Sequence, residues 1–211
     1  MGFVGTRKEM IQKYGPFVKQ ITKGTGIFPG TVFSQMVTES SAFVNGVNTV
    51  GASLLTRRSN NFFGIKAFPG SWSGPIYRID TDEEDSTGAT YTDKNAAFRK
   101  YPTVEDSIKD YLKLITNKRY TSFGVNTAPN VREQFVRLKK AGYMTSTGYV
   151  NLATAVYEGL KKDIDAIPEP TVLTATSNKK KIFLILALVG GLAYIGMQQK
   201  IKTKIKKFIY E

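Results

Sequence analysis

The chain has 211 residues, 41% of them apolar, which is enough for one domain with a sizeable core and an additional segment. It has no histidine and no cysteine, which excludes thiol nucleophiles, a Ser-His-Asp triad, disulfides and zinc sites made of these residues, so acid–base chemistry must use carboxylates, tyrosine or lysine. The 30 Lys and Arg residues against 17 Asp and Glu give a net charge of +13, which indicates an anionic partner.

The positive charge is concentrated toward the C-terminus. Up to Pro170 the chain holds 22 basic and 16 acidic residues, a surplus of 6, and after it 8 basic residues and 1 acidic residue, a surplus of 7. The basic pairs before Pro170, such as Arg57-Arg58 and Lys139-Lys140, are typical of solvated faces and are not interleaved with aromatic residues. No nucleic acid is therefore expected as a partner.

Helical and strand patterns alternate along the first 165 residues. Residues 1–10 lack the apolar run of a secretory signal peptide, so the fold is expected to begin at once. Apolar residues at helical spacing predict helices over Glu9–Gln20, Thr31–Phe43, Val131–Lys140 and Tyr149–Asp163, and another that follows a cap at Thr103. Glycine, aromatic and β-branched residues between Ser59 and Tyr101 predict a small hairpin lobe. The sequence therefore predicts an α+β domain over residues 1–165.

The segment after this domain has the composition of a membrane anchor. Residues 166–178 are predicted to be a linker, because they contain two prolines and several Ser and Thr residues. The uncharged run Ile182–Met197 has 16 residues and is flanked by lysines. As a helix it is about 24 Å long, short of the ~30 Å hydrocarbon core, but flanking lysines extend its reach by snorkelling.

We therefore predict a C-terminal transmembrane helix over residues 179–199. Residues 200–211 are predicted to form a basic amphipathic helix on the surface of an anionic lipid bilayer. More lysines follow the apolar run than precede it. Because cytoplasmic flanks of membrane helices are rich in Lys and Arg, the C-terminus is predicted on the cytoplasmic side and the domain on the other side. The alternative is a C-terminal core helix that packs on the domain.

Glu39 is the first candidate for acid–base chemistry. It follows Val32 and Met36 on one stripe of the predicted second helix, and Phe43 continues the stripe. A carboxyl group beside apolar neighbours loses hydration, which raises its pKa above the usual value of ~4.3 and allows it to act as a general acid. The alternative is a glutamate at the edge of the stripe that reaches water.

A second group of carboxylates lies in the predicted hairpin lobe. Asp80–Asp85 holds five acidic side chains in six positions. Such a run is typical of a solvated acidic loop or of a weak calcium site. In a cleft, it could instead supply the second carboxylate of a glycosidase pair.

Five blocks of sequence resemble a known family. They are Thr31–Ser40, Ser59–Ala67, Ala97–Tyr101 with Ser107–Tyr111, Lys118–Tyr120 and Ala141–Tyr143. In this order and spacing, over residues 5–163, they are similar to the glucosaminidase domain of glycoside hydrolase family 73. The resemblance implies a mostly helical, lysozyme-like α+β fold that hydrolyses the β-1,4 bond after N-acetylglucosamine in peptidoglycan, without a cofactor or metal.

The resemblance also implies roles for individual residues. Glu39 matches the catalytic acid, Thr81–Glu83 resembles a Thr-x-Glu motif that makes Glu83 the second carboxylate, and Tyr143 matches an active-site tyrosine. The residues implied in substrate binding are Gln35, Asn61, Phe63 and Tyr120. The family usually has Gly-Trp-Gly after its acid, whereas Ser40–Phe43 follows here, so the shape of the subsites is expected to differ.

Several alternatives stay open at this point. Asp82, Glu84 and Asp85 are rivals of Glu83, and the bond cleaved could be that of a muramidase or a lytic transglycosylase. A non-enzymatic, wall-binding structural membrane protein of a virion is a further possibility. The combination of domain and anchor suits a lytic enzyme in a phage virion membrane or in a bacterial cell envelope. The oligomeric state is not predicted.

Overall fold

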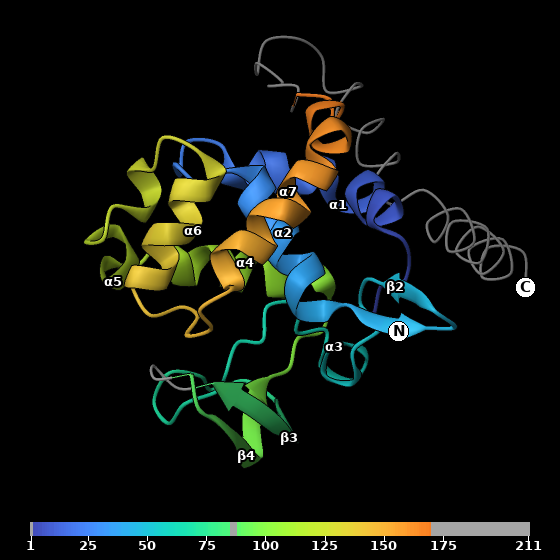
Figure 1. The fold of residues 1–211 in the computed structure, drawn as a ribbon, viewed down its shortest axis with the longest axis vertical. Coiled ribbons are helices and arrows are strands. Elements are labelled where there is room, and N and C mark those ends of the chain that lie inside the picture. Colours follow the sequence, from blue (N-terminus) through green and yellow to red (C-terminus); the bar gives the residue numbers. More distant parts are fainter. Residues whose placement is uncertain (1, 85–87, 170–211) are drawn as a thin grey trace, which may run out of the picture. The chain divides into compact units, whose positions relative to one another are not determined.

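The computed structural model describes residues 2–84 and 88–169. In chain order the elements are α1 (Arg7–Thr22), α2 (Pro29–Ser40), β1 (Ala42–Val44), β2 (Val47–Thr49), α3 (Leu54–Ser59), β3 (Ile76–Glu84), β4 (Thr90–Arg99), α4 (Val104–Ile115), α5 (Lys118–Thr121), a 3₁₀ turn η1 (Val125–Thr127), α6 (Val131–Lys140) and α7 (Tyr149–Asp165). The larger helices gather around α2, and β3 and β4 form a separate hairpin lobe (Figure 1). The predicted α+β class is confirmed.

Helix α2 is the central element of the helical part. Nine of its 12 residues are buried, and it contacts α1, α6 and α7. Gly30 allows the close approach of α7, because a Cβ atom at this position would lie 2.5 Å from the ring of Tyr157. A carboxyl group in the last turn of α2 is therefore attached to a mostly buried helix and not to one on the solvated surface.

Four of the predicted helices are confirmed. α6 has the predicted bounds, α7 continues to Asp165, and α1 includes the predicted residues 9–20. The side chain of Thr103 accepts a hydrogen bond from the amide of Asp106 and caps α4, as its sequence pattern predicts.

The predicted helix over Thr31–Phe43 is wrong at its C-terminal end. α2 stops at Ser40, whose hydroxyl donates to the carbonyl of Met36 and accepts from the amide of Gly51. The chain then enters the hairpin β1–β2, which turns at Asn45 and Gly46, both at positive φ. Phe43 is consequently 78% exposed and does not extend the buried stripe of α2.

The predicted hairpin lobe is confirmed as the antiparallel pair β3–β4. Side chains at alternate positions of β3, from Tyr77 to Glu83, are partly buried, and those between them are exposed. A bulge lies opposite Ile79 and Thr81, where Asn95 adopts a φ of 56°. Asp80 accepts hydrogen bonds from the backbone amide of Asn95 and from Lys94, which holds the bulge in place.

The domain continues past the predicted boundary at residue 165. The side chain of Ile167 is buried and packs against Gly15 of α1, and its carbonyl accepts a hydrogen bond from Lys19 at 2.5 Å. Lys19 also forms an ion pair with Glu169. The first residues of the predicted linker thus belong to the domain, because they cover the apolar surface of α1.

The remainder of the predicted linker, the predicted transmembrane helix at 179–199 and the amphipathic tail at 200–211 lie outside the described residues. Within residues 2–84 and 88–169, no helix has the length and apolar character needed to cross a bilayer.

Candidate active site

Glu39 lies in the last turn of α2 with its two carboxyl oxygens in different surroundings. Oε1 accepts a hydrogen bond of 2.5 Å from the hydroxyl of Tyr149 on α7. Oε2 faces Gly64, where a Cβ atom would lie 3.4 Å away. Burial raises the pKa of Glu39 to about 7, the hydrogen bond from Tyr149 opposes this shift, and the negative charge of Glu83 adds to it. The carboxyl can therefore hold a proton near neutral pH.

The loop that faces Glu39 is held by Asn61. The side chain of Asn61 is 1% exposed; its oxygen accepts from the amide of Ile65 at 3.0 Å and its nitrogen donates to the carbonyls of Ile65 and Arg99, both at 2.9 Å. Both donor hydrogens of the amide are thus used within the protein. Asn61, predicted from the resemblance to bind substrate, shapes the loop around Gly64 instead of presenting its own side chain.

An aromatic cluster stands beside this loop. Phe63 stacks on Tyr111 with ring centroids 4.0 Å apart, and Tyr143 meets Tyr111 edge-on at 5.7 Å. Tyr120 lies against Tyr143 at 6.2 Å, and the hydroxyl of Tyr143 donates to the carbonyl of Phe63 at 3.0 Å. The rings of Phe63 and Tyr120 are buried, whereas Tyr143 is partly exposed. Tyr143 thus combines a hydrogen bond to the loop with partial exposure to solvent.

Glu83 is the carboxylate of the hairpin lobe whose charge acts on Glu39. It lies on the partly buried face of β3 and forms an ion pair with Lys66 at 2.8 Å. Lys66 forms a second ion pair, also of 2.8 Å, with Asp93 of β4. The lobe thus brings the second predicted carboxylate into the electrostatic environment of the first.

The rival carboxylates of the acidic run have other partners. Asp82 accepts a hydrogen bond from the hydroxyl of Thr92, and Asp80 is bound at the bulge. Glu84 accepts from the backbone amide of Thr147, and its carbonyl accepts from the hydroxyl of Thr145, so it attaches the end of β3 to the loop before α7. Asp85 lies outside the described residues. Among the acidic residues that the structure describes, no cluster of three is arranged to hold a metal ion.

The sequence matches one known protein family over most of its length. Residues 15–162 match the glucosaminidase family described as mannosyl-glycoprotein endo-beta-N-acetylglucosaminidase. The chain belongs to this glucosaminidase family. The resemblance stated from the five sequence blocks is thereby confirmed, and with it the assignment to the glycoside hydrolases.

Relatives of this chain include proteins that are named as peptidoglycan hydrolases. The chain is 28% identical to the peptidoglycan hydrolase FlgJ of Vibrio parahaemolyticus over 73% of its own length. The match covers 47% of that relative, so the chain spans less than half of its length.

Two solved structures share the fold. A peptidoglycan hydrolase mutant from Sphingomonas sp. A1 superposes with a TM-score of 0.59 and 21% identity, over 75% of this chain and 98% of that one. A C-terminally truncated glycoside hydrolase domain of Salmonella typhimurium FlgJ gives a TM-score of 0.52 and 28% identity, over 74% and 99% of the two chains.

Gln35 is the most deeply buried of the four residues that are predicted to bind substrate. The side chain of Gln35 is 0% exposed and contacts the hydroxyl groups of Tyr111 and Tyr149. The position of Gln35 on α2 directs its side chain into the core, where its amide is bound by two tyrosines, so a contact between Gln35 and substrate stays a prediction.

Sequence reasoning missed two residues that contact the candidate carboxylates. The sequence indicates Tyr149 only as the start of a helix, and Lys66 only as part of the block Ser59–Ala67. A lone tyrosine or lysine carries no spacing signal, so these contacts follow from the fold alone.

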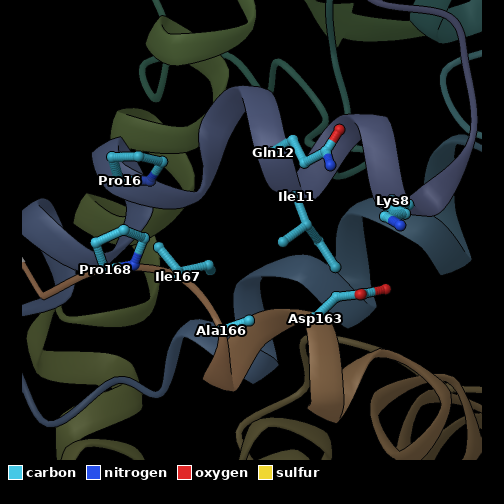
Figure 2. A pocket seen from close by; sticks show the side chains of 8 residues that line it. All are labelled: Lys8, Ile11, Gln12, Pro16, Asp163, Ala166, Ile167 and Pro168. Carbon is cyan, nitrogen blue, oxygen red and sulfur yellow. The ribbon is translucent and has the colours of Figure 1, made fainter.

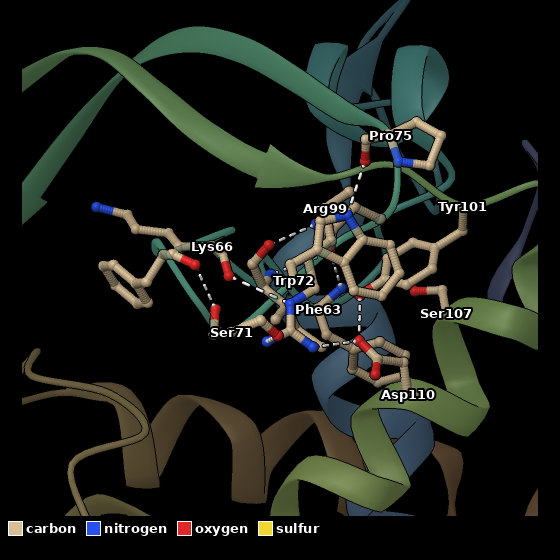
Figure 3. Close-up of polar contacts among 12 residues, drawn as sticks. Phe63, Lys66, Ser71, Trp72, Pro75, Arg99, Tyr101, Ser107 and Asp110 are labelled. Carbon is tan, nitrogen blue, oxygen red and sulfur yellow. Dashed lines mark hydrogen bonds and ion pairs between the residues drawn. The ribbon is translucent and has the colours of Figure 1, made fainter.

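The backbone around Lys66 is held by Arg99, as Figure 3 shows. Nε of Arg99 donates to the carbonyl of Lys66 at 3.3 Å, and a second nitrogen donates to the carbonyl of Ser71 at 3.2 Å. The guanidinium is neutralised by Asp110 at 2.8 Å, and Asp110 also accepts from Tyr101. A buried arginine thus keeps Lys66 at the base of the hairpin lobe.

A separate pocket of about 420 Å³ lies between α1 and the end of α7 (Figure 2). Its charged lining residues are Lys8 and Asp163, and Ile11 and Ile167 supply apolar surface. With a single carboxyl group in its lining, it lacks the pair that glycoside hydrolysis requires.

Proposed function

We propose that this domain is a peptidoglycan hydrolase that cleaves the β-1,4 bond after N-acetylglucosamine. In this proposal Glu39 protonates the leaving glycosidic oxygen, and Glu83 stabilises the oxocarbenium-like transition state or activates the attacking water. The relatives that are named peptidoglycan hydrolase FlgJ support the substrate class.

The observation that carries the mechanism is the contrast between the two carboxyl groups. Burial raises the pKa of Glu39 to about 7, which keeps a proton available, whereas Glu83 is paired with the cation of Lys66. Two carboxyl groups in such different environments are suited to two separate roles. One is the general acid, and the other stabilises the positive charge of the transition state or activates the water. The charge of Glu83 also favours the protonated form of Glu39, so Glu83 supports the role of Glu39 as the acid.

Tyr143 is proposed to contact the substrate near the reacting bond. Its hydroxyl hydrogen is donated to the carbonyl of Phe63, so its oxygen retains lone pairs that can accept a hydrogen bond from a sugar amide or hydroxyl group. Burial, together with neighbours that include Glu39, raises its pKa well above the usual range, which keeps it neutral during turnover.

Product analysis on purified peptidoglycan tests this function. Digestion by the full chain is expected to release fragments with N-acetylglucosamine at the reducing end, as identified by mass spectrometry after borohydride reduction. N-acetylmuramic acid at the reducing end would indicate a muramidase, and an anhydro-muramic end a lytic transglycosylase. No cleavage by the wild type, with retained binding to the wall, would support the non-enzymatic alternative.

We also propose that residues 179–211 attach the enzyme to a lipid bilayer, in a virion membrane or in a bacterial envelope. The support is the uncharged run between lysine clusters and the lysine-rich end of the chain. The full chain is expected to float with vesicles of anionic lipid in a density gradient, whereas a chain that ends at Pro170 is expected to stay in the dense fraction. Equal behaviour of both chains would contradict the proposal.

A further inference from the structure

The carboxyl of Glu39 is the partly buried end of a row of hydrogen bonds that starts in the core, on another helix. The hydroxyl of Tyr111 on α4 donates to the side-chain oxygen of Gln35 on α2. The amide nitrogen of Gln35 lies 3.4 Å from the hydroxyl oxygen of Tyr149 on α7, which donates to Oε1 of Glu39 at 2.5 Å. Gln35 and Tyr111 are each 0% exposed and Tyr149 is 9% exposed.

The donor and acceptor groups fix the direction in which each hydrogen bond of the row is donated. The oxygen of Gln35 is occupied by Tyr111, so the side that faces Tyr149 is an NH₂ group, which can only donate. Tyr149 therefore accepts from Gln35, and its own hydrogen is directed to Glu39. Burial, and next the charge of Glu39, raise the pKa of Tyr149 well above its usual range, so the hydroxyl stays a donor at every working pH.

This direction distinguishes the two oxygens of Glu39. Oε1 is occupied as an acceptor, so the proton of the neutral acid belongs on Oε2. Oε2 faces Gly64, and the lack of a side chain there keeps a Cβ atom from lying 3.4 Å from this oxygen. The other titratable groups that interact with this carboxyl are Glu83 from β3, whose negative charge favours the protonated acid, and Tyr111 and Tyr143, whose own pKa values are raised by burial and by the charge of Glu39.

We infer that Tyr149, oriented by Gln35 and Tyr111, is a positioning residue that turns the proton-bearing oxygen of Glu39 toward the glycosidic bond. This inference rests on the proposed role of Glu39 as the general acid. The row of hydrogen bonds acts through Glu39 and does not touch the substrate.

The substitution Tyr149→Phe removes the donor and keeps the ring. We expect kcat to fall by about 10- to 100-fold with little change in KM, because Glu39 is still present but its proton-bearing oxygen is no longer held toward the glycosidic bond. Since the lost hydrogen bond favoured the ionised form of Glu39, the pKa of Glu39 rises, and the loss of activity at high pH is expected to begin at a higher pH than in the wild type. A merely structural role would lower the melting temperature without this displacement of the pH profile.

A matched control is Tyr157→Phe, which makes the same change on the same helix at a ring that packs against Gly30. It is expected to leave kcat and the pH profile unchanged. If Tyr149→Phe fails to fold, Tyr111→Phe provides the same readouts: without the Tyr111 hydroxyl, the Gln35 amide can turn its oxygen to Tyr149 and draw the hydrogen away from Glu39. The pH profile is then expected to move in the same direction.

The outcomes separate this inference from the proposed function. If Glu39→Gln keeps wild-type activity, the role of Glu39 fails and the inference fails with it. If Glu39→Gln is inactive while folded Tyr149→Phe, or Tyr111→Phe in its place, keeps the wild-type kcat and pH profile, the role of Glu39 stands and the positioning role of Tyr149 is refuted.

Discussion

The Nζ atom of Lys66 lies 2.8 Å from a carboxylate oxygen of Glu83 on β3 and 2.8 Å from one of Asp93 on β4. One cation therefore joins the two strands of the hairpin lobe where the proposed second carboxylate is located. Backbone pairing with Phe98 and the hydrogen bond from Arg99 hold the residue that carries this cation. Glu83 thus has a defined position although it lies on a two-stranded hairpin.

Replacing Lys66 by methionine should impair catalysis more than folding. Glu83 and Asp93 would lose their shared cation and repel each other, which would displace the carboxylate from its working position. We expect kcat to fall by about 100-fold, the size of effect that follows a displacement of about 1 Å. Lys94→Met is the control, because Lys94 pairs with Asp80 at an exposed position on the same hairpin. Equal activities of the two variants would argue against a role for Lys66.

The rate of hydrolysis should fall as the pH rises through about 7, because Glu39 must carry a proton to act as the acid and its pKa is raised to about 7 by burial. Initial rates on purified peptidoglycan, measured between acidic and alkaline pH, would locate the pH at which the rate falls. Replacing Glu83 by glutamine removes a charge that raises the pKa of Glu39. The activity that remains should therefore fall at a lower pH than in the wild type. This direction is opposite to that expected for Tyr149→Phe.

Glu39 should lower the stability of the folded protein at alkaline pH. Its pKa is higher in the folded state than the ordinary value of 4.5, so the folded state binds the proton more tightly, and stability falls as the pH rises from about 4.5 to about 7. Glu39→Gln should remove this loss and increase the free energy of unfolding at pH 8 by about 1–3 kcal/mol, with little gain at pH 4. Urea denaturation of both proteins at the two pH values measures the difference, and an equal gain at both would contradict the pKa assignment.

Gly64→Ala should reduce activity beyond its effect on stability. Gly64 has a φ of 61°, where a side chain costs about 1 kcal/mol, and the new Cβ would lie 3.4 Å from Oε2 of Glu39. Gly24→Ala makes the same change at a φ of 76° with no atom within 4 Å, so it carries the backbone cost alone. Comparable melting temperatures with a loss of activity only in Gly64→Ala would support the assignment of Oε2 as the proton-bearing oxygen.

Much of this domain could be predicted from the sequence, because the relevant signals are local. Helical spacing located four of the larger helices, and the cap at Thr103 marked the start of α4. The absence of His and Cys limited acid–base chemistry to carboxylates, tyrosine and lysine, and the position of Glu39 after Val32 and Met36 indicated a buried carboxyl. The helices, the cap and the position of Glu39 depend on residues within a few turns of one another, and the limit on acid–base chemistry depends on composition alone.

Only the tertiary structure decided how Glu39 is surrounded. Tyr149 lies 110 residues from Glu39 in the chain, and no periodicity connects a tyrosine on one helix with a glutamate on another. The ion pair of Lys66 with Glu83 depends in the same way on the folding of the hairpin lobe. The family resemblance implied that Gln35 and Asn61 contact substrate, but both side chains are buried and bind groups of the protein, since a buried amide must find its partners inside. The sequence by itself determined which groups could perform the chemistry, and the packing of α2, α4 and α7 determined where their protons are held.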